Sequence, residues 1–332
     1  MPELRKDPVI GRWVIISTER GKRPSDFEEI KEEKKGGFCP FCYGNEDKTP
    51  PEIFAIRPDG SPPNKPGWTL RVVPNKYPAL RIEGQLNRQG EGIYDKMNGV
   101  GAHEVIIETP DHDKDLADLE VSAIRDVFWV YRERVLDLKK DIRLKYAMIF
   151  KNHGASAGAS LEHTHSQLIA TPILPKRVTE EIDGARTYFN YKERCIFCDI
   201  IRQEVKDAVR LVYEEEFFVA IEPYAARFPF ETWILPKQHM SHYEHISDEL
   251  LQHLAVTMKE VLARINLALN RPPYNFVIHT APMQEGPMEH YHWHIEFMPK
   301  LTRIAGFEWG TGFYINPTSP EDAAEYLRNI NL

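Results

Sequence analysis

The chain carries the same series of features twice, and this repeat limits the folds open to it more than any other property. Each copy opens with a C-x-x-C motif, continues with an apolar strand that ends at a lone histidine, then a helix and a second strand, and closes with an H-x-H motif. The C-x-x-C motifs span residues 39–42 and 195–198, and the H-x-H motifs begin at His163 and His292. Because chance rarely preserves such an order, we interpret the two copies as a duplication.

Hydrophobic spacing predicts the elements within each copy. Apolar residues recur at helical intervals from Leu116 to Val135, and Tyr146 to Lys151 has the pattern of a strand. We therefore expect a mixed α+β fold of two duplicated halves, each a mainly antiparallel sheet with packed helices. The expected boundaries are 1–172 for the first half, 191–332 for the second and 173–190 for a linker, with a long surface loop from Thr49 to Pro66.

Composition excludes several classes of protein. A formal net charge of -8 and a pI near 5.9 argue against a general nucleic-acid binder, which needs an excess of Lys and Arg. No apolar run approaches the roughly 20 residues of a membrane helix, and the first residues lack the apolar core of a secretion signal. We expect a cytoplasmic protein with neither nucleic acid nor membrane as a partner.

The four cysteines predict metal sites rather than disulfides, because all of them lie in C-x-x-C motifs. Two thiolates and two imidazoles in each half would complete a tetrahedral, structural zinc shell, giving two zinc ions per chain. Other histidines could replace the chosen ones, namely His103, His153, His242, His245 and His290, and buried free thiols are the simpler alternative. The expected ligand sets are Cys39, Cys42, His112 and His163, and Cys195, Cys198, His239 and His292.

The first H-x-H motif predicts a catalytic strand. Side chains alternate between the faces of a strand, so His163, His165 and Gln167 share one face. If zinc holds His163, then His165 keeps a free lone pair and can attack phosphorus as a neutral imidazole. The preceding loop, residues 154–160, contains only Gly, Ala and Ser and could cradle a phosphate. An inward-facing polar strand beside an ordinary metal site is the alternative.

The neighbours of His165 carry donor groups that suggest their roles. Gln167 would donate its amide hydrogen to a phosphoryl oxygen, and Ser160 would donate its hydroxyl to the other substrate. In the second half Glu296 occupies the position of Gln167, where its charge would repel a phosphate, so only the first half should be active. His294 and Glu296 could be a relic, a second metal shell or a structural pair.

With these motifs in place, the chain resembles the galactose-1-phosphate uridylyltransferase family of the histidine triad superfamily over nearly its whole length. The resemblance rests on H-x-H-x-Q and on further segments: Arg20–Pro24, Arg71–Asn75, Asn152 with Gly158 and Ser160, Tyr274–Pro282 and Gly306–Glu308. It implies a homodimer and a covalent nucleotidyl intermediate on His165. It also implies zinc at the first of the two ligand sets, and UDP-glucose or another nucleotide sugar with hexose 1-phosphate as substrates.

The same resemblance implies the contacts of individual side chains with the substrate. Arg20 and Arg23 would bind the diphosphate, and Glu308 the hexose hydroxyls. The other implied substrate residues are Phe41, Asn75 and Tyr77 for the nucleoside, together with Asn152 and Gly158.

Some residues depart from the uridylyltransferase pattern. Lys76 stands where that family usually has Asp, and the stretch from Gly306 to Pro317 resembles the plant ADP-glucose phosphorylase branch, which transfers AMP to inorganic phosphate. The metal site of the galactose branch aligns with Glu181, His279 and His294, but Glu296 replaces its remaining histidine, which favours a cysteine-containing zinc site over iron.

Two other classes of protein are alternatives, a double zinc-ribbon interaction module and a histidine-triad hydrolase. Gln167 favours transfer over hydrolysis.

Overall fold

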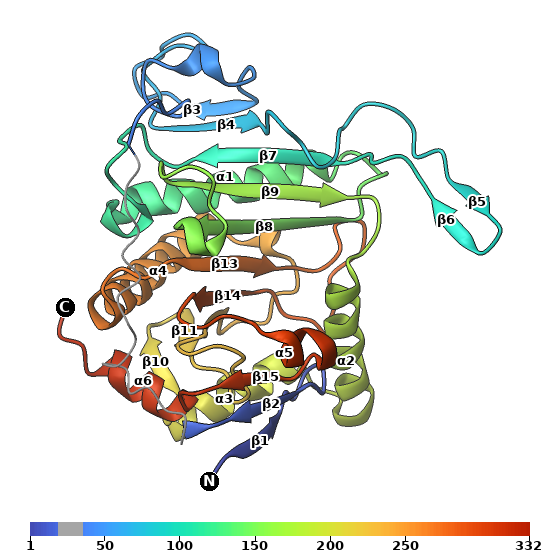
Figure 1. The fold of residues 1–332 in the computed structure, drawn as a ribbon, viewed down its shortest axis with the longest axis vertical. Helices are drawn as coiled ribbons and strands as arrows, with labels where there is room; N and C mark the ends of the chain where they lie inside the picture. The colour runs from blue at the N-terminus through green and yellow to red at the C-terminus, as the bar shows by residue number, and fades with distance from the viewer. Residues whose placement is uncertain (19–35) are drawn as a thin grey trace.

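The structure is a computed structural model that describes residues 1–18 and 36–332. Its centre is a ten-stranded antiparallel sheet in the order β10-β11-β12-β14-β13-β8-β9-β7-β4-β3 (Figure 1). The first half supplies β3 (Phe54–Ile56), β4 (Leu70–Pro74), β7 (Ala102–Ile107), β8 (Tyr146–His153) and β9 (His165–Thr171). The second half supplies β10 (Leu211–Glu214), β11 (Phe218–Ile221), β12 (Thr232–Pro236), β13 (Tyr274–His279) and β14 (His294–Pro299).

The strand order confirms the predicted duplication. Read from the two edges inward, the first half runs β3-β4-β7-β9-β8 and the second runs β10-β11-β12-β14-β13. The halves meet where β8 pairs with β13, with Asn152 opposite Asn275. The expected α+β fold is therefore correct, and the two expected sheets are joined edge to edge into one.

Helices cover both faces of the sheet (Figure 1). On one face, α1 (Val121–Leu138) and α4 (Asp248–Leu269) contribute to the main hydrophobic core, together with apolar side chains of both halves. On the other face, α2 (Lys176–Lys192) and α3 (Ile196–Asp207) pack over the second half. The stretch expected to be a linker is thus mostly helix α2, because Val178, Ile182 and Ala185 recur at helical spacing and are buried. The division into two domains stays a prediction.

The remaining elements lie around this sheet. A small sheet joins β1 (Glu3–Lys6), β2 (Trp13–Ile16) and β15 (Tyr314–Asn316), followed by α6 (Pro320–Arg328). Figure 1 shows α5 (Gly306–Thr311) beside β15 and a hairpin of β5 (Gln89–Glu91) and β6 (Tyr94–Lys96) that projects from the body. The surface loop expected over Thr49–Pro66 includes β3, which pairs with β4 at the sheet edge. Within the described residues, no helix is both long and apolar enough to cross a membrane.

A buried ion pair supports β9 from the face of the sheet that α1 and α4 cover. Lys151 Nζ lies 2.7 Å from Glu108 Oε2 and donates hydrogen bonds to Thr164 Oγ1 and to the His165 carbonyl oxygen at 2.8 and 3.0 Å. Neither charged side chain is exposed to solvent. Burial alone would raise the pKa of Glu108, but the charge and hydrogen bond of Lys151 outweigh it and hold that pKa below its ordinary value.

We predict that removing either member of this pair destabilises the protein strongly. Glu108→Gln leaves a buried, uncompensated ammonium group, which should cost about 3–5 kcal/mol of unfolding free energy in chemical denaturation. Because the folded-state pKa of Glu108 is lowered, its contribution is complete above the ordinary value of 4.5 and is lost as the pH falls through the folded-state value. The exposed pair Lys96–Glu91 is the control, and Glu91→Gln should leave stability unchanged. An equally small effect of Glu108→Gln would contradict the analysis.

Candidate active site

The structure brings the first predicted metal-ligand set together. One atom each of Cys39, Cys42, His112 and His163 lie within 4.8 Å of one another. Both histidines present Nδ1 to Cys42 Sγ, at 3.2 Å for His112 and 3.7 Å for His163. The other nitrogen of His163, Nε2, donates to the Thr109 carbonyl oxygen at 2.8 Å and so fixes the tautomer. Two thiols and two imidazole nitrogens in this arrangement fit a tetrahedral zinc ion.

The second set repeats this geometry. Cys195, Cys198, His239 and His292 also place their ligand atoms within 4.8 Å of one another. Nδ1 of His239 and of His292 lie 3.4 and 3.6 Å from Cys198 Sγ. Nε2 of each donates to a carbonyl oxygen, that of Met288 and that of Pro236. The same set of donors, here with a carbonyl partner for each histidine, therefore fits a second zinc ion.

His165 presents one nitrogen for chemistry. Its Nδ1 lies 2.8 Å from the His163 carbonyl oxygen and must donate to it, so Nε2 carries the lone pair. Burial lowers the pKa of His165 to about 4, which keeps the imidazole neutral at pH 7. The Phe41 ring packs edge-on against it with centroids 5.3 Å apart. The backbone of a predicted metal ligand thus orients His165 as a neutral imidazole with a free Nε2.

Gln167 lies on the same face of β9 and contacts a residue whose role the sequence did not reveal. His103 Nε2, on β7, is 2.8 Å from Gln167 Oε1, and Asn75 Nδ2 is 3.1 Å from the same His103 nitrogen. Asn75 Oδ1 accepts the backbone N–H of Tyr77, whose side chain is 83% exposed. His103, considered from sequence as a substitute zinc ligand, instead joins the residues expected to contact the nucleoside and the phosphate.

The small-residue loop after β8 adopts backbone conformations that favour glycine, as its composition predicts. Gly154 and Gly158 have φ values of 84° and 91°, in the region that favours glycine, on either side of a 3-10 turn at Ala155–Ala157. Asn275 of β13 donates to both Asn152 Oδ1 and the Ala157 carbonyl oxygen at 2.8 Å, which ties the loop to the second half. Ser160, the last residue of the loop, is exposed.

Of the residues expected at the substrate, two are outside the described part of the chain and a third belongs to a helix away from β9. Arg20 and Arg23 lie outside the described residues. Glu308 belongs to α5, which lies beside β15 and α2 rather than beside β9 (Figure 1). Its carboxylate accepts the backbone N–H groups of Ala305 and Ile315 at 2.8 and 3.2 Å, within its own segment.

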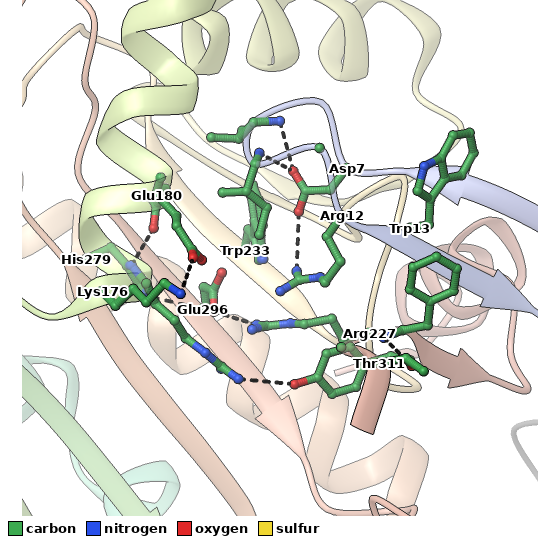
Figure 2. A pocket seen from close by; sticks show the side chains of 18 of the residues that line it. Asp7, Arg12, Trp13, Lys176, Glu180, Arg227, Trp233, His279, Glu296 and Thr311 are labelled. Carbon is green, nitrogen blue, oxygen red and sulfur yellow. Dashed lines mark hydrogen bonds and ion pairs between the residues drawn. The ribbon is translucent and has the colours of Figure 1, made fainter. Parts of the chain in front are cut away.

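A cavity of about 620 Å³ is lined by residues of the N-terminal segment, of α2 and of the second half, and it reaches Glu296, the counterpart of Gln167 (Figure 2). There Glu296 is bound by Arg227, with Nη2 and Oε2 2.5 Å apart, and Arg227 also bonds to Glu231 at 2.8 Å. His279 lies 2.8 Å from Glu181; burial would lower the pKa of His279, but Glu181 and Glu296 outweigh it and raise that pKa to about 10. His279 is thus a cation at pH 7 in a network of paired charges, which supports the structural-pair interpretation of Glu296. Atoms of Glu181, His279 and His294 also lie within 4.8 Å of one another, but a metal there would have to displace the His279 proton.

Two family descriptions match this chain. The N-terminal domain of galactose-1-phosphate uridyl transferase matches residues 60–175, and the C-terminal domain of the same enzyme matches residues 181–329. A galactose-1-phosphate uridylyltransferase of Thermotoga maritima is 34% identical, with 100% of this chain and 99% of that protein covered. The chain belongs to the galactose-1-phosphate uridylyltransferase family. It is therefore a nucleotidyltransferase of carbohydrate metabolism.

Within this family, the chain is also similar to phosphorylases. An ADP-glucose phosphorylase of Arabidopsis thaliana is 40% identical, with 100% of this chain and 93% of that protein covered. A crystal structure of an ADP-glucose phosphorylase from Arabidopsis thaliana with bound ADP-glucose has a TM-score of 0.86 at 39% identity, with both chains fully covered. A uridylyltransferase structure has a TM-score of 0.77 at 28% identity, covering 99% of this chain and 97% of that chain. The resemblance to both branches, inferred from sequence, is confirmed.

Proposed function

We propose that this galactose-1-phosphate uridylyltransferase family member transfers UMP between a UDP-hexose and a hexose 1-phosphate through a covalent bond to His165. The observation that carries the proposal is the orientation of His165. Its Nδ1 is committed to the His163 carbonyl oxygen at 2.8 Å, and its lowered pKa leaves Nε2 unprotonated at pH 7. A fixed, neutral imidazole on the same face as a donor amide is suited to attack on phosphorus.

The proposed reaction consists of two displacements. His165 Nε2 attacks the phosphorus that carries the nucleoside, a P–N bond forms, and the P–O bond to the departing hexose 1-phosphate breaks with its electron pair on that oxygen. A phosphate oxygen of the second hexose 1-phosphate then attacks the same phosphorus and releases His165. The Gln167 amide donates to a non-bridging oxygen, and backbone N–H groups of residues 154–160 approach the other phosphate. Ser160, Asn152 and Gly158 are proposed to bind substrate at the same loop.

Zinc has a supporting role in this proposal. The ion held by Cys39, Cys42, His112 and His163 would supply a fixed tetrahedral anchor and no reacting group. Anchoring His163 also fixes the carbonyl oxygen that orients His165. The four cysteines are free thiols, which agrees with zinc binding and with a reducing, cytoplasmic location.

A homodimer would bring Glu308 to the active site. Within one chain, α5 lies beside β15 and α2. The proposed contact of Glu308 with hexose hydroxyls therefore requires the Glu308 of a second copy. The exposed Phe307 and Trp309 next to it are 50% and 73% accessible, and they provide apolar surface for such an interface.

Transfer of AMP from ADP-glucose to inorganic phosphate is the second candidate function. The Arabidopsis thaliana phosphorylase is 40% identical over the whole chain, against 34% for the Thermotoga maritima uridylyltransferase. Lys76 is the residue in the nucleoside-binding segment that departs from the uridylyl pattern. The chemistry at His165 is the same for both candidates, so the nucleobase and the acceptor distinguish them.

We predict that His165, rather than His163, becomes nucleotidylated. His165→Asn should keep its fold and zinc but lose labelling by a nucleotide sugar, because only Nε2 of His165 has an uncommitted lone pair. His163→Asn should lose zinc and stability together. Mass spectrometry of the trapped, acid-labile adduct identifies the residue. A nucleotide found on His163, or full turnover by His165→Asn, would refute the mechanism.

We predict close to two zinc ions per chain in protein purified without added metal. Cys42→Ser and Cys198→Ser should each remove about one ion, because each thiol lies within 3.7 Å of two histidine nitrogens in its own cluster. Elemental analysis of the purified variants gives the count. A Cys198→Ser variant with an undiminished metal content would show that the second cluster does not bind zinc.

We predict that UDP-glucose with galactose 1-phosphate reacts faster than ADP-glucose with phosphate. The measurement is a panel of both nucleotide sugars, each offered to both acceptors, with initial rates compared. A rate for ADP-glucose plus phosphate at least about tenfold higher, which is about 1.4 kcal/mol in barrier height, would establish the second candidate instead.

A further inference from the structure

We propose that His103 is a positioning residue that fixes which way round the side-chain amide of Gln167 lies. The inference rests on the proposed transfer through His165 and adds a residue to it. His103 stands on β7 opposite Ile169, and Val105 stands opposite Gln167, so all four side chains share the catalytic face of the sheet. A histidine two residues from the partner of Gln167 is a diagonal neighbour, within reach across the two strands.

The hydrogen bonds of His103 determine its tautomer. The backbone N–H of Ala79 donates to His103 Nδ1 at 3.1 Å, so Nδ1 carries the lone pair. In the neutral ring the hydrogen is then on Nε2, and it points to Gln167 Oε1 at 2.8 Å. The 3.1 Å approach of Asn75 Nδ2 to the same nitrogen joins two N–H groups and is a contact without a hydrogen bond. His103 therefore donates to Gln167.

This donation matters because a glutamine amide has two nearly equal ends. With Oε1 held by His103, the NH₂ end of Gln167 stays free to donate to a phosphoryl oxygen. Without that N–H the amide can turn by half a rotation, which presents Oε1 to the phosphate and replaces attraction by repulsion. His103 thus acts on the transition state through Gln167, without touching the substrate itself.

The second half couples the same two positions by a different interaction. Trp233 stands opposite Glu296, as Val105 stands opposite Gln167, so Glu231 is the counterpart of His103. Glu231 and Glu296 are joined through Arg227, at 2.8 and 2.5 Å. Gln167 is thus held directly by His103, whereas Glu296 is linked to Glu231 through Arg227. Only in the first half does the arrangement leave donors free for an anion.

A double-mutant cycle tests the proposal. The rate of His165 labelling is measured for His103→Ala, Gln167→Ala and the double variant, using whichever of UDP-glucose and ADP-glucose labels the unmodified chain faster. Loss of the Gln167 donor should slow labelling by about 100-fold or more, and His103→Ala by about tenfold, with KM for the nucleotide sugar unchanged. In the Gln167→Ala background, His103→Ala should have no further effect, because there is no amide left to orient. His253→Ala is the matched control: this histidine also bonds to a side-chain oxygen, Glu215 at 2.7 Å, and should label at the unmodified rate.

A second measurement does not depend on activity. Nitrogen NMR of histidine-labelled protein should show His103 as the Nε2–H tautomer, assigned by the loss of its signals in His103→Ala. An Nδ1–H tautomer, or equal losses of rate in the presence and absence of Gln167, would overturn the proposal. Failure of both nucleotide sugars to label His165 would instead refute the proposed function, and the tautomer would still decide whether His103 holds Gln167.

Discussion

The hydrogen bonding of β9 on both of its edges is the constraint on which the site depends. Paired with β7 on one side and β8 on the other, the strand cannot slip by one residue without exchanging its two faces. One face carries His165 and Gln167, and the other carries Ser166, which bonds to Tyr131 of α1. The Lys151 ammonium group holds the His165 carbonyl oxygen from this second face. The side chains proposed for catalysis and those that support the strand thus lie on opposite faces of β9, because side chains alternate along a strand.

The two halves share some parts of this site and differ in others. The metal-ligand geometry is the same in both, and His294 Nδ1 lies 3.1 Å from the His292 carbonyl oxygen, as His165 does from that of His163 at 2.8 Å. A phenylalanine contacts the imidazole in both halves, but Phe197 is tilted by 31° to His294, whereas Phe41 meets His165 edge-on. The difference lies in the side chains on the face of the imidazole, which include the amides of Gln167 and Asn75 in the first half and the ion pair of Arg227 with Glu296 in the second. The backbone and the ligand clusters are therefore common to both halves, and the charge of the side chains around the imidazole distinguishes them.

Much of this arrangement could be predicted from sequence, because it follows from local patterns. The C-x-x-C spacing, the alternation along His163, His165 and Gln167 and the repeated order of motifs led to the two ligand clusters and the duplicated α+β fold. The helical spacing of Val178 and Ile182 was also present in the region expected to be a linker, and burial of that face decided the outcome. The contacts of His103, Lys151 and Asn275 were not predictable, because each depends on the register between strands that are distant in sequence. No local pattern records such a register.

The pairing of β8 with β13 constrains the second half in a way that its own chemistry does not. A separate first half would end its sheet at β8 and expose a row of unpaired backbone groups, which is a template for aggregation. It would also lose Asn275, which fixes the loop after β8. The register of β13 against β8 is therefore a requirement on the second half that is separate from its ligand cluster and its charges. By pairing with β8 and holding the loop after it, β13 gives the second half a structural role that requires no reaction of its own.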